Sequence, residues 1–257
     1  MGFVLRGGMM LLDQSRKEVI LRIPQPRTRR QAQEFLDATG FCRIWILGYS
    51  QMAPPLYALL TGPEGDSLNW TARQQQPFEE LKLAITSAPA LGLPDPKPFT
   101  LYVTEKDKVA MGVLSQTMGT WDRPVAYLSK RLDNVATGWP GCLWTVAAVP
   151  LPIQEATELT LGQDLIIKVP HVVNTLPLRG PHKWLSTSQI TQYQRLLREN
   201  PCVTIEPCQA LNPVTFLPVG EGGPSRLQGY PRSFCQQTWL ERPANLRPRL
   251  DPEHRWH

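Results

Sequence analysis

The middle of the chain alternates between apolar and polar positions in a way that predicts three consecutive β-strands. Residues 99–104 (FTLYVT) place an apolar side chain at every second position, which is the period of a half-buried strand. The same alternation recurs at 109–116 (VAMGVLSQ) and at 124–130 (PVAYLSK). The polar segments EKDK and TMGTWDR separate these runs, so we expect the strands to pair in an antiparallel order.

The segment before the strands shows the three- and four-residue apolar spacing of helices. Ala32, Phe35, Leu36 and Thr39 fall at positions i, i+3, i+4 and i+7, which defines one buried stripe. A Thr-x-x-Gln sequence beginning at Thr28 has the spacing of a capping box, which would satisfy unpaired amides at the helix start. The pattern therefore predicts an amphipathic helix that begins just after Thr28.

Two more helices are predicted before residue 90. The first covers 51–60, despite the Pro54-Pro55 pair near its start. The second covers 77–88 (PFEELKLAITSA). Another capping-box spacing begins at Thr71, but a helix from there would contain Pro77 in its interior. We expect the helix to start at Pro77 instead, because a proline at the first helical position lacks only an N–H that would be unpaired anyway.

Shorter elements are predicted at both ends of the chain. A strand at 3–5, a Gly7-Gly8 turn and an apolar run at 9–12 form the N-terminal lead. The later part predicts a fourth strand at 163–169, a short helix at 171–176, a helix at 186–199 and a fifth strand at 203–205.

These elements predict an α/β chain, in which a small helical unit precedes a mixed sheet with helices. We expect the helical unit, with its short N-terminal strand region, at 1–89 and the α/β domain at 99–218. Residues 90–98 (ALGLPDPKP) have the composition of a linker. Residues 219–257 keep no apolar periodicity and are rich in arginine and proline, so a disordered tail is expected there.

Composition narrows the class of protein. The 257 residues carry a net charge of +5, which is compatible with a polyanionic partner but is also common without one. The five cysteines form no CxxC pair and no histidine is spaced near them, so no zinc site is expected and the thiols favour a reducing compartment. No apolar run reaches the ~20 residues that span a bilayer. We expect a soluble cytoplasmic or nuclear protein with no cofactor and no membrane partner.

Several longer motifs resemble one protein family. RPVAYLSKRLD followed by GWP-x-CL resembles the connection subdomain of gammaretrovirus-type reverse transcriptases. RKEVILRIPQPRTRRQAQEFLDATGFCRIWILGYSQMAPPLYALL resembles the thumb of the same enzymes. The resemblance covers about residues 3–218 in the family's order. It implies an endogenous retroviral Pol protein, with a thumb-like unit at 1–89 and an RNase H-like connection domain at 99–218.

The residues needed for the family's two metal-dependent reactions are not where the resemblance would put them. No two aspartates are adjacent, whereas the polymerase site of the family carries an Asp-Asp pair. An RNase H site needs carboxylates around two metal ions, but Thr104 stands at the first-strand position, and Glu105 and Asp107 are expected off the site. The matching helix, GCLWTVAAV, has no acid. We therefore predict no catalytic residue and no metal site.

Without catalytic sites, nucleic-acid binding is the function that the resemblance still implies. In the family the thumb helix and connection hold an RNA–DNA hybrid, largely through its backbone. Ordinary core packing is the alternative for Phe41 and Trp45. A solvated helix start is the alternative for Arg29 and Arg30. Asp37 stands where the family typically has glycine, and its carboxylate would repel phosphate. The nucleic-acid-binding candidates carried over by motif are Arg29, Arg30, Gln33, Phe41, Arg43 and Trp45.

A further departure concerns the helix that follows the three strands. Pro150 and Pro152 interrupt it, and an interior proline costs about 3 kcal/mol. We expect the helix to end at Val149 and to restart after Pro152.

The predicted function is that of a non-catalytic fragment of an endogenous retroviral reverse transcriptase, with at most weak, sequence-independent binding of RNA–DNA hybrid. Two alternatives stay open. The chain could be a component of an RNA-directed DNA polymerase or RNase H enzyme whose active sites other domains supply, or a module that binds a host protein. The sequence names no protein partner.

Overall fold

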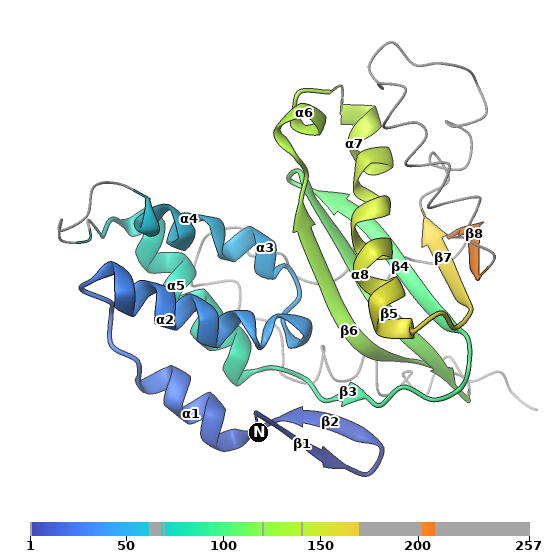
Figure 1. Cartoon of the computed structure of the whole chain (residues 1–257), viewed down its shortest axis with the longest axis horizontal. Coiled ribbons are helices and arrows are strands. Elements are labelled where there is room, and N and C mark those ends of the chain that lie inside the picture. Colours follow the sequence, from blue (N-terminus) through green and yellow to red (C-terminus); the bar gives the residue numbers. More distant parts are fainter. Residues whose placement is uncertain are drawn as a thin grey trace, which may run out of the picture.

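A computed structural model describes residues 2–61, 68, 70–119, 121–139, 141–169 and 202–208. Figure 1 shows a group of short helices and a small sheet packed beside a larger mixed sheet, with further helices across that sheet's face. The helices predicted at 171–176 and 186–199 and the tail predicted at 219–257 lie outside the described residues. Among the described residues, no helix is both long and apolar enough to span a membrane.

The chain begins with a β-hairpin whose turn depends on glycine. Strands β1 (Phe3–Arg6) and β2 (Met9–Leu12) pair antiparallel, with Phe3 opposite Leu12. Gly7 and Gly8 have φ angles of 56° and 72°, which residues with a side chain rarely adopt. The predicted lead is confirmed. Strand β3 (Leu91–Gly92) lies inside the predicted linker and pairs with β2, which makes a three-stranded sheet.

Helix α1 (Gln14–Arg22) was not predicted. Asp13 caps it, because its carboxylate accepts hydrogen bonds from the Ser15 N–H at 3.4 Å and the Ser15 hydroxyl at 2.6 Å. Ile20 is its single buried residue. The segment therefore lacks the apolar stripe on which the prediction of helices depended.

Helix α2 (Arg29–Gly40) buries the four predicted residues, Ala32, Phe35, Leu36 and Thr39. The Thr28 hydroxyl accepts the Gln31 N–H at 3.3 Å, as a capping residue should. The Gln31 side chain, however, accepts the N–H of Arg27 at 2.9 Å rather than that of Thr28. The helix start is as predicted, but the return half of the capping box is displaced by one residue.

The helix predicted at 51–60 is divided into shorter pieces. They are α3 (Tyr49–Met52), α4 (Pro54–Tyr57) and the 3₁₀ turn η2 (Ala58–Leu60). A further 3₁₀ turn, η1 (Arg43–Trp45), precedes them and was not predicted. Pro54 and Pro55 lack the N–H groups that would join α3 to α4 in one helix. Pro54 instead occupies the start of α4, where no such bond is needed.

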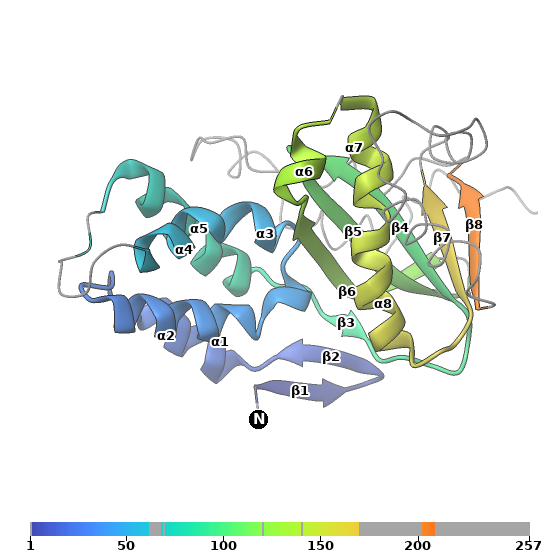
Figure 2. The same ribbon diagram turned by 45° about the horizontal axis from the view of Figure 1, so that its top comes forward.

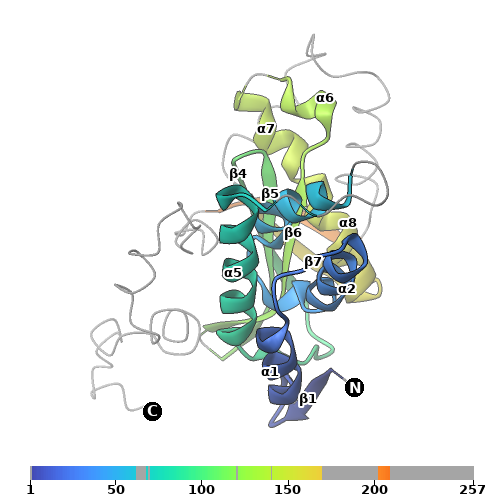
Figure 3. The same ribbon diagram turned by 90° about the vertical axis from the view of Figure 1, so that its left-hand side faces the viewer.

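Helix α5 (Ala72–Thr86) corrects the prediction that the helix starts at Pro77. The capping box at Thr71 forms, and the Thr71 N–H donates to the Gln74 side chain at 3.2 Å. Pro77 therefore lies inside the helix. Burial of Phe78 and its ring contact with Phe35, at a centroid separation of 4.6 Å, favour continuing the helix across the proline. Figure 3 shows α2 and α5 side by side in front of the large sheet.

The larger sheet confirms all five strands predicted for this domain. Its order is β6-β5-β4-β7-β8, with antiparallel pairing of β4, β5 and β6 and parallel pairing of β4 with β7 and of β7 with β8. The mixed α/β class is thereby confirmed. The strands are β4 (Phe99–Lys106), β5 (Val109–Met118), β6 (Trp121–Arg131), β7 (Leu165–Val169) and β8 (Val203–Pro207).

Helices α7 (Gly141–Ala148) and α8 (Pro150–Thr160) cross one face of this sheet, after the short α6 (Asn134–Thr137), as Figures 1 and 2 show. The helix was predicted to restart after Pro152, but α8 begins at Pro150. Both prolines thus lie in the first turn of α8, where N–H groups have no helical partner. Their cost is accordingly well below that of prolines in a helix interior.

Polar contacts join the helical part to the sheet. Ser50 donates its N–H to the Ser129 hydroxyl at 3.0 Å, and its own hydroxyl donates to the Ser129 carbonyl at 2.6 Å. Arg123 on β6 donates to the carbonyls of Gly8, at 3.1 Å, and Leu93, at 2.8 Å. One apolar core also extends from α2 and α5 to Met111 and other residues of the sheet.

Candidate nucleic-acid interface

The predicted binding residues lie on three separate parts of the structure. Arg29, Arg30 and Gln33 belong to the first turns of α2, whose buried stripe turns Arg30 and Gln33 toward solvent. Arg29 is half-buried at the edge of that stripe. Phe41 caps the end of α2, whereas Arg43 and Trp45 belong to η1.

The exposed face of α2 mixes both signs of charge. Arg30 forms an ion pair with Glu34 at 3.0 Å, and the Gln33 side-chain amide donates to the Asp37 carboxylate at 2.8 Å. These four residues stand at positions i, i+3, i+4 and i+7 and therefore share one face of the helix. Arg30 is the one cation among them, whereas Glu34 and Asp37 both carry carboxylates, so Asp37 is not the only acid that a phosphate would face.

Phe41 and Trp45 differ in exposure although their rings are neighbours, with centroids 6.5 Å apart. The Phe41 side chain is 45% exposed, and the Arg16 guanidinium lies over its ring at 4.1 Å from the centroid. Trp45 is only 2% exposed, and its indole N–H donates to the Met10 carbonyl at 3.4 Å. Phe41 is accessible to a ligand, whereas Trp45 is part of the core.

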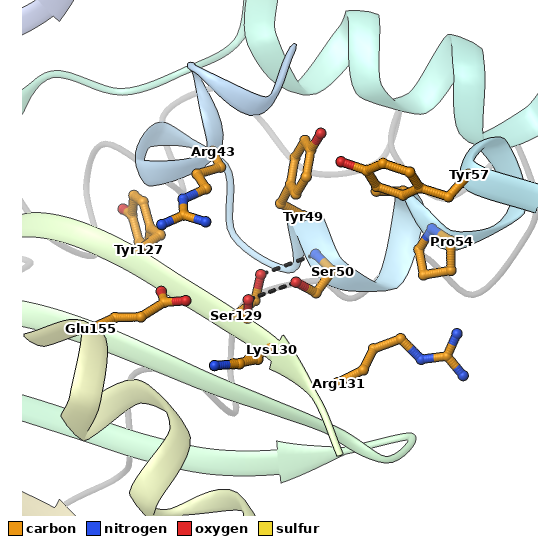
Figure 4. A pocket seen from close by; sticks show the side chains of 11 residues that line it. Arg43, Tyr49, Ser50, Pro54, Tyr57, Tyr127, Ser129, Lys130, Arg131 and Glu155 are labelled. Atoms are coloured by element: carbon orange, nitrogen blue, oxygen red, sulfur yellow. Dashed lines mark hydrogen bonds between the residues drawn. The ribbon is translucent and has the colours of Figure 1, made fainter. Parts of the chain in front are cut away.

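Arg43 lines a pocket of about 350 Å³ between the short helices and the sheet. Figure 4 shows its guanidinium pointing from η1 toward β6 beside Tyr127, with Lys130 and Arg131 farther along the strand. The other described lining residues are Tyr49, Ser50, Ala53, Pro54, Tyr57, Tyr127, Ser129 and Glu155.

Two buried groups, one in the pocket wall and one next to Arg43 in the chain, stay in their uncharged forms. Burial raises the pKa of Tyr49 to about 12, so the phenol is protonated at neutral pH. Its hydroxyl donates to the Leu36 carbonyl at 3.4 Å and lies 3.3 Å from the Thr39 hydroxyl. Burial also raises the pKa of the Cys42 thiol, although nearby Arg16 opposes that rise. Neither group offers a nucleophile at neutral pH.

Comparison with known proteins shows which family this chain resembles in sequence. A model of the RNase H-like domain found in reverse transcriptase matches residues 70–167. The Gag-Pol polyprotein of koala retrovirus is 48% identical over 220 residues, which are 85% of this chain. Those of feline leukemia virus and baboon endogenous virus are 48% and 46% identical over 87% and 88% of the chain. The chain belongs to the gammaretroviral Pol family.

This gammaretroviral Pol chain spans 13% of the length of each of these polyproteins. Two structures of the foamy viral protease-reverse transcriptase share its fold at 24% identity. One is described as a complex with double-stranded DNA and has a TM-score of 0.69, covering 81% of this chain and 38% of the viral chain. The other is described as a complex with RNA/DNA hybrid and has a TM-score of 0.68, covering 87% and 32%.

In the RNase H-like part of the Pol chain, Glu105 and Asp107 are the acids that follow Thr104 in the sequence. Thr104 on β4 is 8% exposed and lies opposite Met111. The Glu105 carboxylate accepts the Lys108 N–H at 2.8 Å, and Asp107 lies in the β4–β5 turn with a φ of 53°. Within the described residues, no three His, Cys, Asp or Glu side chains form a group that could hold a metal ion.

Sequence reasoning missed two cations that lie beside Arg43. Lys130 and Arg131 both belong to the motif RPVAYLSKRLD, but neither was predicted to bind a ligand, although adjacent cations at a strand end are a visible signal. Their approach to the short helices depends on the Ser50–Ser129 contact, which joins positions 79 residues apart. No local pattern in the sequence carries that information.

Proposed function

We propose that this chain is the thumb-and-connection part of a gammaretroviral reverse transcriptase, and that it binds nucleic acid weakly and without sequence preference, with RNA–DNA hybrid preferred. The observation that carries the proposal is the 48% identity to Gag-Pol over 85% of the chain. The fold shared with a reverse transcriptase described in complex with RNA/DNA hybrid supports it. We assign the thumb-like unit to 1–89, the linker to 90–98 and the connection to 99–218.

The proposed contacts follow from exposure and charge. Arg30, Gln33 and Phe41 are exposed, and Arg43 lines a solvent-facing pocket, so each can reach a nucleic-acid backbone. Arg29 lies at the edge of the same face. Buried Trp45 is excluded from direct contact and is assigned to packing. Because Glu34 and Asp37 oppose phosphate on α2, we expect micromolar or weaker affinity.

We further infer that the isolated chain does not catalyse RNA cleavage. Thr104 occupies the first-strand position at which a metal-binding carboxylate is required, and a neutral hydroxyl cannot replace an anionic ligand of Mg²⁺. The stretch of α7 offers no acid. The activity left to the chain is binding.

The proposal is tested by fluorescence anisotropy of a labelled RNA–DNA hybrid at about 50 mM and about 200 mM salt, with circular dichroism of the same sample to verify folding. We expect binding that weakens steeply with salt. Arg30→Ala should weaken binding and lower the salt slope by about 1, as the loss of one phosphate contact does. Asp37→Asn keeps an acceptor for Gln33 and removes the charge, so it should strengthen binding. Salt-independent binding would contradict the backbone-contact model.

A second candidate is a structural component of a complete reverse transcriptase or RNase H enzyme. It is favoured by the relatives, which are polyproteins of which this chain matches 13%. Neither candidate gives the isolated chain an active site of its own. We expect no Mg²⁺- or Mn²⁺-dependent cleavage of a labelled hybrid, either by the chain or by Thr104→Asp. Metal-dependent cleavage by the unaltered chain would reject the assignment as non-catalytic.

A further inference from the structure

A second cavity extends the pocket at Arg43 into a groove. This cavity, of about 490 Å³, shares Ser50, Pro54 and Arg131 with the pocket of about 350 Å³. It continues past Arg73 of α5 and Asp107 in the β4–β5 turn. We call the two together the α4–β6 groove, after two elements that line it; Figure 4 shows the first of the two cavities.

The groove carries an excess of positive charge. Arg43, Lys130, Arg131 and Arg73 line it, against the carboxylates of Glu155 and Asp107 among its other described lining residues. All four cations are exposed. In the described part of the chain, none of the four has a carboxylate within ion-pair distance. Four neighbouring cations without such partners create a positive potential that favours a polyanion.

The cations are distributed over both cavities rather than gathered in one. Arg43 and Lys130 line the first cavity, Arg73 lines the second, and Arg131 lines both. A single small anion would require donors that converge on it. Donors distributed along a groove suit a ligand with repeated charges, such as consecutive phosphates of one polynucleotide strand.

The groove wall is also held in a fixed shape. The paired hydrogen bonds between Ser50 and Ser129 fix α3 against β6, as Figure 4 shows. Tyr49 and Tyr127 are buried in the wall, whereas Tyr57 is exposed at the rim. A preformed wall lowers the entropy cost of binding, and an exposed tyrosine ring offers a surface for a sugar or base.

We propose that the α4–β6 groove is a second phosphate-binding track, which holds the backbone of one strand of the bound nucleic acid. The proposal rests on the proposed function and adds a site that is distinct from the exposed face of α2. In this track, Lys130 and Arg131 contact phosphates directly. The groove then contributes more charge to binding than α2, where acids and an arginine offset each other.

The test compares two double variants that remove the same charge. Lys130→Ala with Arg131→Ala removes two exposed groove cations, whereas Arg6→Ala with Lys97→Ala removes two exposed cations that line neither cavity. With the labelled hybrid, we expect the groove variant to bind roughly tenfold more weakly at about 50 mM salt and to lower the salt slope by about 2. The control variant should differ little from the unaltered chain. The hybrid should also protect Lys130 from acetylation, as measured by mass spectrometry.

The possible failures are distinguishable. If the groove variant matches the control while Arg30→Ala weakens binding, the groove proposal is wrong and the proposed function stands. If the unaltered chain binds no hybrid, the proposed function fails and the groove assignment fails with it. If poly-glutamate of equal charge displaces the hybrid as effectively as unlabelled hybrid does, the groove is not selective for phosphates, and the proposal of a nucleic-acid track is overturned.

Discussion

At the residue scale, burial and not residue type decides which predicted contact residues are available to a ligand. Phe41 and Trp45 are both aromatic and four positions apart, yet one is 45% exposed and the other 2% exposed. Arg29 and Arg30 are adjacent and identical, yet one is half-buried and the other exposed. The motif identified the candidate contact residues, and the packing of α2 and η1 decided which of them are exposed.

Tyr49 gives a prediction of pH dependence. Burial raises its folded-state pKa from 10.0 to about 12, so the unfolded chain loses the phenolic proton at a lower pH than the folded chain does. The contribution of Tyr49 to stability is therefore fully present below pH 10.0 and is lost as the pH rises toward about 12. Urea unfolding at a series of alkaline pH values should show a smaller loss of stability for Tyr49→Phe than for the unaltered chain. The difference between the two proteins at pH 7 reports the lost hydrogen bonds alone, and an identical alkaline loss in both would contradict the prediction.

At the scale of elements, the cost of a proline to a helix depends on its position within that helix. Pro150 and Pro152 lie in the first turn of α8, whereas Pro77 is the sixth residue of α5. A first-turn proline replaces an N–H that has no helical partner, but an interior proline removes a hydrogen bond and crowds the preceding turn. The two helix starts that were predicted from prolines, at Pro77 and after Pro152, were therefore both wrong. Helix α5 begins at Ala72 and α8 begins at Pro150.

Pro77→Ala and Pro150→Ala test this distinction. We expect Pro77→Ala to raise the free energy of unfolding by about 1–3 kcal/mol, since it restores a hydrogen bond within α5. Pro150→Ala should change it by less than about 1 kcal/mol, because the first turn of α8 needs no donor there. Urea denaturation midpoints measure both. Equal gains for the two variants would show that position within the helix is not the deciding factor.

At the scale of the whole molecule, Arg123 joins segments that are far apart in the chain. It is 4% exposed, and it donates to the carbonyls of Gly8 and Leu93 beside the linker segment. Gly92 makes room for it, since a Cβ there would lie 2.8 Å from Arg123 Cδ. Gln116 adds a second connection by donating to the carbonyls of Asp95 and Lys97, each at 2.8 Å. Residues 93–97 are therefore held against the large sheet.

Arg123→Met should loosen this junction. The substitution removes the Arg123 donor from the Leu93 carbonyl and one of two donors from the Gly8 carbonyl, which also accepts the Leu93 N–H at 3.1 Å. Loss of a donor costs about 1–3 kcal/mol where it leaves a buried carbonyl unpaired. Hydrogen exchange followed by mass spectrometry should show faster exchange in the hairpin and around residues 91–95 together. Lys97→Met is the control, because Lys97 is exposed and pairs with Asp95 at 3.9 Å only at the surface. Unchanged exchange in the hairpin would contradict a joining role for Arg123.

The sequence by itself determined the elements whose burial follows a short period. The buried residues of α2, the strands β4 to β8 and the glycine turn of the hairpin could all be predicted, because neighbouring positions alone produce those patterns. Motif order also predicted the gammaretroviral relationship, which the Gag-Pol similarity confirms. Helix α1 could not be predicted in this way, since it buries only Ile20.

Only the tertiary structure decided which distant residues meet. Segments that lie far apart in the sequence are combined in the Ser50–Ser129 contact, the Arg123 junction and the set of cations that line the α4–β6 groove. Such contacts depend on how helices and sheet pack, and packing is set by the summed fit of many side chains rather than by any local period. The sequence therefore indicated what kind of protein this is, and the folded chain decided which of its cations share a surface.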